Sequence, residues 1–140
     1  MRLLKLTGLL ALTLGCAAWA FAQESTAAKT TRKKLQQKIT VEFKEERTKD
    51  VIEAVIGEID KAPKVKIDNA SGVSNNSKLS YKAKDKSVEQ VLNDICDKLD
   101  CGWYVVSNAA NNKVDGSVVV RKSSKGKERG YEAGKEPKEK

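Results

Sequence analysis

The chain has 140 residues, of which 33% are charged and 5% aromatic, and its 27 basic and 19 acidic residues give a net charge of +8. This length allows one globular domain, and the absence of histidine removes the commonest general base and the commonest nitrogen ligand of zinc. The charge does not indicate nucleic-acid binding, because residues 39–120 contain 12 basic and 14 acidic residues and the positive excess lies at the two ends.

The first 22 residues have the organisation of a secretory signal peptide. Basic residues precede a short apolar run at 6–14, and the small residues before position 23 predict cleavage after Ala22. The apolar run is short for a membrane span, so no transmembrane segment is expected in the mature chain. The alternatives are an uncleaved anchor and a lipoprotein signal ending at Cys16, although Thr13 stands where such a signal has an aliphatic residue. The mature chain is expected in the periplasm or outside a bacterial cell.

The leader and the first half of the domain follow the signal peptide. Residues 23–38 contain five basic residues and one acidic residue, which predicts a flexible basic leader with or without a short helical piece. The segment 39–43 alternates apolar and polar residues, as a half-buried strand does. Thr48 is a suitable N-cap for a helix that runs to about residue 60. A second alternating segment at 64–68 predicts another strand.

The second half repeats this order and adds a strand. A strand is expected at 79–83, followed by a helix at 87–99 that Ser87 can cap. The apolar residues of this helix recur at helical spacing and are Val88, Val91, Leu92, Ile95, Cys96 and Leu99. Residues 102–107 and 117–121 are rich in β-branched and aromatic side chains, which predicts two strands joined as a hairpin.

The two halves match when the sequence is shifted by forty residues. The apolar positions of the first helix then fall on those of the second: Val51, Ile52, Val55, Ile56 and Ile59 on Val91, Leu92, Ile95, Cys96 and Leu99. The alternating strands that precede the helices also match. The sequence therefore predicts an α+β domain of two tandem βαβ units plus a C-terminal hairpin strand (β-α-β-β-α-β-β), with both helices packed on small sheets.

This order resembles the secretin and TonB short N-terminal domain family. In that family each helix opens with a small or polar residue followed by a pair of apolar positions, and a glycine with an aromatic residue leads into the next strand. The corresponding positions here are Thr48, Val51 and Ile52, then Ser87, Val91 and Leu92, then Gly102, Trp103 and Tyr104. The resemblance covers residues 39–122 and implies a non-enzymatic protein–protein interaction module, here as a stand-alone secreted domain. The charged segment 123–140 is predicted to be a disordered tail.

Cys96 and Cys101 are the two cysteines of the mature chain. An even number of cysteines in an oxidising compartment favours a disulfide. The Cα atoms of a disulfide lie about 4.4–6.8 Å apart, which a continuing helix does not allow at this spacing. The bridge therefore requires the chain to turn back near Asp100, a residue type that tolerates the left-handed conformation. The alternative is a pair of buried thiols, and both remain open.

No motif in the sequence indicates a catalytic residue, a cofactor or a metal site. The chain has no glycine-rich phosphate loop and no Gly-x-Ser-x-Gly elbow. The expected partner is another envelope protein, which adds a strand to a sheet edge and contacts Tyr104 and Val106 on the outer face, while Trp103 faces the helices. One alternative is that Tyr104 only covers the hairpin. Another is that the basic termini bind an anionic envelope polymer or membrane surface.

Overall fold

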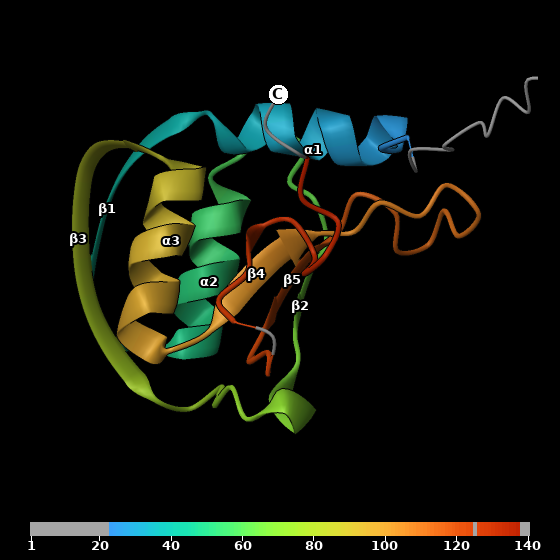
Figure 1. Ribbon diagram of the computed structural model, residues 1–140. Helices are drawn as coiled ribbons and strands as arrows, with labels where there is room; N and C mark the ends of the chain where they lie inside the picture. The colour runs from blue at the N-terminus through green and yellow to red at the C-terminus, as the bar shows by residue number, and fades with distance from the viewer. Residues whose placement is uncertain (1–22, 125, 138–140) are drawn as a thin grey trace, which may run out of the picture.

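The structure is a computed structural model that describes residues 23–124 and 126–137. Two helices, α2 (Thr48–Gly57) and α3 (Val88–Leu99), lie side by side between two sheets, and α1 (Thr26–Leu35) lies across one end of the molecule (Figure 1). The predicted α+β class, with helices packed on small sheets, is confirmed. The predicted signal peptide, its cleavage site after Ala22 and the alternative lipid-modified Cys16 lie outside the described residues.

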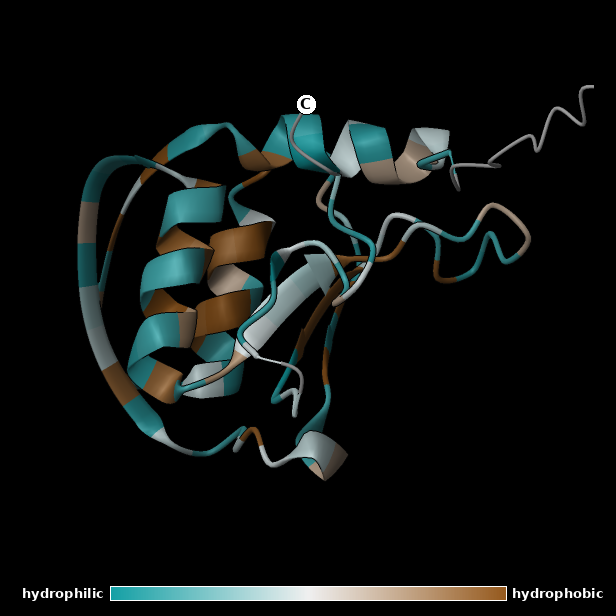
Figure 2. Cartoon of the chain, viewed as in Figure 1, coloured by the Kyte–Doolittle hydropathy of each residue, from teal (hydrophilic) through white to brown (hydrophobic). Residues whose placement is uncertain are grey.

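The first sheet consists of two antiparallel strands, β1 (Lys38–Arg47) and β3 (Lys78–Ser87). Residues that face the helices are buried or partly buried and are Ile39, Val41, Phe43, Leu79, Tyr81 and Ala83. The intervening residues are exposed and polar, and Figure 2 shows bands of hydrophilic colour along both strands. The alternation predicted at 39–43 and 79–83 is therefore confirmed, within strands that are longer than expected.

The helix starts differ from each other in how they are capped. The Ser87 hydroxyl accepts a hydrogen bond from the Gln90 N–H, and the Gln90 side chain accepts one from the Ser87 N–H, which makes a capping box for α3. The prediction that Thr48 caps α2 is wrong, because Thr48 is the first helical residue and Arg47 occupies the cap position. The Thr48 hydroxyl donates instead to the Ser77 carbonyl at 2.9 Å.

Replacing Ser87 with alanine is expected to lower the free energy of unfolding by about 1 kcal/mol, because the first turn of α3 loses its side-chain acceptor. Ser87→Thr keeps a hydroxyl and is the matched control. Urea unfolding followed by circular dichroism measures both, and equal losses from the two variants would contradict a capping role for the hydroxyl.

The second sheet has the strand order β2-β5-β4-β6. Its strands are β2 (Val65–Ile67), β4 (Gly102–Val105), β5 (Val118–Arg121) and β6 (Arg129–Gly130). β4 and β5 are antiparallel, so the predicted hairpin is confirmed, whereas β2 and β6 run parallel to their neighbours. Each predicted strand–helix–strand unit gives one strand to each sheet, and its own two strands do not pair with each other.

Equivalent hydrogen bonds relate the two halves of the domain. The Thr48 N–H donates to the Ser77 carbonyl at 2.8 Å, and the Val88 N–H donates to the Gln37 carbonyl at 3.0 Å. The two donors are forty positions apart along the chain, and so are the two acceptors. Each half therefore fixes the start of its own helix with a carbonyl from the other half, as expected of two similar units that pack around a pseudo-twofold axis.

The same forty-residue shift relates two irregularities in the first sheet. Glu45 and Asp85 have positive φ values of 52° and 54°. The Glu45 N–H donates to the Ser80 hydroxyl at 3.0 Å and the Asp85 N–H donates to the Thr40 hydroxyl at 3.1 Å. A positive φ is uncommon for a residue other than glycine. Its recurrence at matching positions supports a structural repeat beyond the similarity of two amphipathic helices.

The short helical piece that the sequence allowed within residues 23–38 is α1, but this segment is packed against the domain and is not a flexible leader. The Ser25 hydroxyl caps α1 by accepting a hydrogen bond from the Ala28 N–H at 3.1 Å. Ala28 and Leu35 are buried, and the Thr31 hydroxyl donates to the Gly116 carbonyl at 2.7 Å. Two apolar residues seven positions apart are too few to show a helical period in a basic background, so the contacts with the rest of the domain stabilise this helix.

Candidate functional site

The two aromatic residues of β4 point to opposite faces of the second sheet. Trp103 faces the helices and is 1% exposed, and its indole N–H donates to the Asn93 side-chain oxygen at 2.7 Å. Tyr104 lies outside the hydrophobic core, on the other face. Both orientations agree with the sequence prediction.

The predicted exposed aromatic surface at Tyr104 and Val106 is not present. Tyr104 is only 9% exposed, and the Arg121 guanidinium lies 4.6 Å from the centre of its ring. Burial raises the pKa of the Tyr104 hydroxyl. Val106 is half-buried, and its backbone bonds to Ser117 and Gly116 in the turn that leads to β5. The alternative, in which Tyr104 is part of the packed structure, agrees with this burial.

The outer face of β4 is covered by residues 126–137, called the C-terminal strap below. β6 extends the second sheet at the edge of β4, and the strap lies over β4 (Figure 1). The backbone N–H of Trp103 donates a hydrogen bond to the Glu128 carbonyl at 3.0 Å. The prediction of a disordered tail at 123–140 is therefore wrong for residues 126–137. Polar contacts hold this strap in place, and its sequence has no apolar periodicity from which its structure could be predicted.

Gly102 allows the strap to approach β4 closely. A Cβ atom at this position would lie 2.6 Å from the Glu128 backbone nitrogen, closer than packed atoms tolerate. Gly102 does not have a positive φ, so its own backbone conformation does not require glycine. A glycine is needed here because the backbone of Glu128 lies so close to it, and glycine often occurs where two backbones approach each other.

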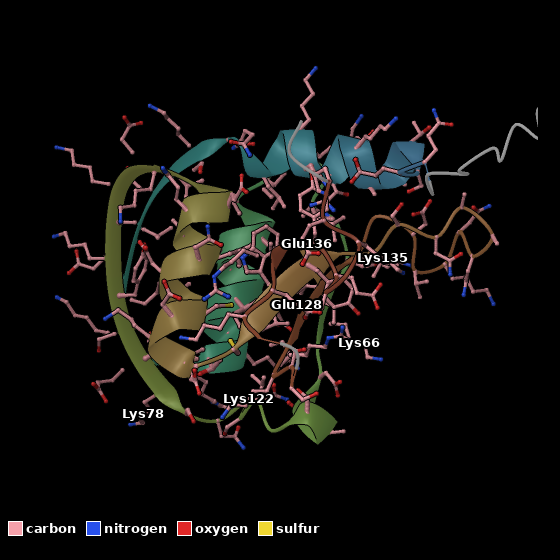
Figure 3. The ribbon with its side chains drawn as sticks, viewed as in Figure 1. Lys66, Lys78, Lys122, Glu128, Lys135 and Glu136 are labelled. Atoms are coloured by element: carbon pink, nitrogen blue, oxygen red, sulfur yellow. The ribbon has the colours of Figure 1, made fainter. Side chains whose placement is uncertain are left out.

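A buried ion pair joins the strap to β5. The Glu128 side chain is 1% exposed and accepts two hydrogen bonds from the Arg121 guanidinium, at 3.0 Å from Nε and 2.7 Å from Nη2. The Ala133 N–H donates to the same carboxylate at 3.0 Å. Figure 3 shows Glu128 against β4 in the middle of the molecule. The hydrogen bonds to Glu128 raise the pKa of Arg121 further above its usual value. This geometry is the bidentate fork in which arginine recognises a carboxylate.

Two further arginines hold the strap. Arg32 of α1 forms an ion pair with Glu24, donates to the Gly130 carbonyl, and lies 3.5 Å from the ring centre of Tyr131. Arg129 forms an ion pair with Asp97 of α3 and donates to the Cys101 carbonyl at 3.0 Å. These residues could not be identified from the sequence, because a basic leader and a charged tail carry no apolar pattern. The single aromatic residue of the tail, next to Gly130, was the one available signal.

Cys96 and Cys101 meet where α3 ends. Asp100 is left-handed (φ 52°, ψ 48°), as the sequence analysis required, and the Cys101 N–H donates to the Cys96 carbonyl at 3.0 Å. The Asp100 N–H donates to the same carbonyl, so the chain closes the helix with a left-handed residue, an arrangement that frequently brings the side chains of these two positions into contact. Both are buried free thiols in the structure. The hydrogen bond to Cys101, together with burial, raises the pKa of Cys96, whereas the hydrogen bond from Cys96 and the charge of Arg129 lower that of Cys101.

The described residues also contain an open groove of about 480 Å³ between α1 and the 112–117 segment. Lys34, Lys64 and Lys113 line it, together with threonine hydroxyls and Asp115. Within the described ranges, no three side chains of the usual metal-ligating types gather into a set that can hold an ion. No helix in that part of the chain has the length and apolar character needed to cross a bilayer.

Comparisons with protein-family models, curated proteins and solved structures found nothing that matches this chain. The geometry of its own residues is therefore the basis for the functional argument. The candidate surfaces are the exposed two-stranded sheet, the edge of β4 under the C-terminal strap, and the lysine-lined groove.

Proposed function

We propose that this chain is a non-enzymatic protein–protein interaction module of the bacterial cell envelope, in the periplasm or outside the cell. The resemblance to the secretin and TonB short N-terminal domain implies this function. The arrangement of two repeated helices between two small sheets is in keeping with it. The partner is another envelope protein.

The observation that carries this proposal is the two-stranded sheet. In the described part of the chain, β1 and β3 pair only with each other, so each ten-residue strand has an outer edge without a neighbouring strand. Such an edge presents backbone N–H and C=O groups to which an extended segment can add. The first sheet therefore offers the longest backbone surface for a partner strand.

Charged side chains cover the outer face of this sheet. Glu42 lies at its centre, 3.4 Å from both Lys44 and Lys82. These three residues are exposed, and Lys84 adds a further positive charge beside them. Lysines on an edge strand discourage indiscriminate pairing between sheets, so they favour a partner that supplies opposite charge.

Site-specific photo-cross-linking in the cell envelope tests this function. A photoreactive side chain at Lys82 is expected to give a discrete adduct of higher mass, because this position lies at the centre of the exposed sheet. The same group at Lys66, an exposed lysine of β2 in the second sheet, is the matched control. Digestion of the adduct with a protease, followed by mass spectrometry, identifies a protein partner.

Two outcomes contradict the proposal. Equal cross-linking from both positions would mean that the first sheet has no special role. An adduct that resists protease and disappears at high salt would favour the alternative, an anionic polymer or membrane surface bound by lysines such as Lys34, Lys64 and Lys113 around the groove.

A further inference from the structure

The C-terminal strap is attached to β4 mainly by polar contacts and contributes few buried apolar side chains of its own. Its deeply buried side chain is a carboxylate, that of Glu128, whereas Tyr131 and Ala133 are only half-buried. Its ladder with β4 spans two residues. Burying a charged pair carries a desolvation penalty that offsets much of its attraction, so such a pair selects a particular partner more than it adds stability. The strap therefore has the character of a specific ligand that is weakly held.

The surface under the strap has three features that recognise such a ligand. Gly102 leaves room for a backbone, since a Cβ there would collide with Glu128. Arg121 binds the carboxylate through two hydrogen bonds. Arg32 binds the carbonyl of Gly130 and stacks on the aromatic ring that follows it.

The strap residues that fill this surface form a short pattern. Glu128 supplies the carboxylate, Gly130 has a φ of 83° and lies against Trp103, and Tyr131 supplies the ring. Glycine is favoured at the third position because positive φ is unfavourable for other residues. The ligand is thus an extended segment with the pattern Glu-x-Gly-aromatic, running parallel to β4.

We propose that the edge of β4 is an acceptor site for an extended Glu-x-Gly-aromatic segment of a partner protein, and that the C-terminal strap occupies this site as an internal competitor. The proposal rests on the proposed interaction function and names a second surface for it. Displacing the strap exposes the backbone of β4, the Arg121 guanidinium and the Tyr104 ring together. A partner segment restores the same contacts when it adds to the edge.

Competition from the C-terminal strap lowers the apparent affinity of the β4 edge for a partner segment. The connection between β5 and β6 is short, so the strap has an effective concentration on the order of millimolar at the acceptor. A free segment of equal intrinsic affinity is therefore excluded at micromolar concentration. The apparent affinity for a segment rises when the strap is weakened, because the competent state becomes more populated.

A fluorescent peptide with the sequence of residues 126–137 tests the proposal by anisotropy titration. The full-length protein is expected to bind it weakly, since the strap competes. Full-length Glu128→Ala is expected to bind it at least about 10-fold more tightly, because its own strap lacks the carboxylate and the peptide supplies one to Arg121. The peptide carries three basic and three acidic residues, so general attraction to a basic protein does not favour it.

The matched control is the full-length double variant Glu128→Ala, Gly102→Ala. Its strap is also weakened, but the new Cβ occupies the path of any backbone at the β4 edge. Binding of the peptide is expected to be lost. Because this variant can also fail by misfolding, a second control uses the single Glu128→Ala protein with a peptide in which the glutamate is replaced by glutamine, and at least a 10-fold weaker binding is expected.

Three results overturn the proposal. The first is no gain in peptide affinity for Glu128→Ala over the unmodified protein. The second is equal binding of the two peptides. The third is a concentration-dependent dimer of the unmodified protein whose subunits exchange straps, which would make a second copy the occupant. None of these measurements uses the first sheet, so failure here leaves the cross-linking test of the proposed function intact.

Discussion

Replacing Trp103 with alanine is expected to lower the free energy of unfolding by about 3–5 kcal/mol. The indole is 1% exposed and packs between the second sheet and the helices, so the substitution removes a large buried surface and leaves a cavity. Small domains have a total stability of about 5–15 kcal/mol, so a large part of it is lost. Urea unfolding at equilibrium, followed by far-ultraviolet circular dichroism, measures the change.

Trp103→Phe is the control that separates packing from hydrogen bonding. It keeps an aromatic ring in the core but removes the indole N–H that donates to Asn93. Because Asn93 is only half-buried, its oxygen can bind water instead. The expected loss is about 1–2 kcal/mol, the usual range for a hydrogen bond together with a small packing defect. Similar losses for both variants would contradict the view that Trp103 acts mainly by filling the core.

Oxidation of Cys96 and Cys101 to a disulfide is expected to stabilise the domain by about 2 kcal/mol, according to the chain-entropy relation for so short a loop. An exchange reaction with oxidised glutathione achieves this. The Cys101 thiolate attacks one glutathione sulfur and releases one glutathione thiolate. The Cys96 sulfur then displaces the second glutathione and completes the bridge. The measurement is the midpoint of thermal unfolding with and without a reducing agent.

Thiol labelling checks whether the bridge forms in the cell: protein from the periplasm, the compartment proposed above, is denatured without reduction so that the buried cysteines become accessible. Modification of neither cysteine before reduction, and of both after it, is the expected result. The matched control is the variant in which both cysteines are alanine, whose unfolding midpoint is expected to be independent of the reducing agent. Labelling of both residues in unreduced protein would mean that the buried thiol pair seen in the structure is the cellular form.

Local sequence signals predicted the parts of the molecule that a regular pattern specifies. The alternation at 39–43 and 79–83, the capping Ser87 and the turn at Asp100 all depend on contacts within a few residues or on one buried face. The burial of Trp103 toward the helices followed from the alternation of side chains along a strand, which places it with Val105, and from the match of Val105 with Val65 at the forty-residue shift. These features could be predicted because secondary structure and its apolar period are encoded in neighbouring residues.

The candidate sites could not be predicted in the same way. Tyr104 was expected to be exposed because nothing in its own strand marks the segment that covers it. The position of that segment, the C-terminal strap, depends on contacts between residues that are distant along the chain, such as Arg32 with Gly130 or Arg129 with Asp97. The sequence contains many acidic residues and carbonyl groups with which each arginine could pair, and only the folded structure determines which one it contacts.

The sequence by itself determined the α+β class, the forty-residue repeat and the two amphipathic helices, because burial of apolar side chains imposes a period that neighbouring residues record. The tertiary structure alone decided that the strands of each half separate into two sheets, that α1 is a packed helix and that the C-terminal strap closes the edge of β4. Those outcomes depend on which groups pair with the backbone edges of the strands and with the charged side chains. Many residues along the chain offer suitable donors, acceptors or charges, so only their positions in the folded structure determine which of them pair.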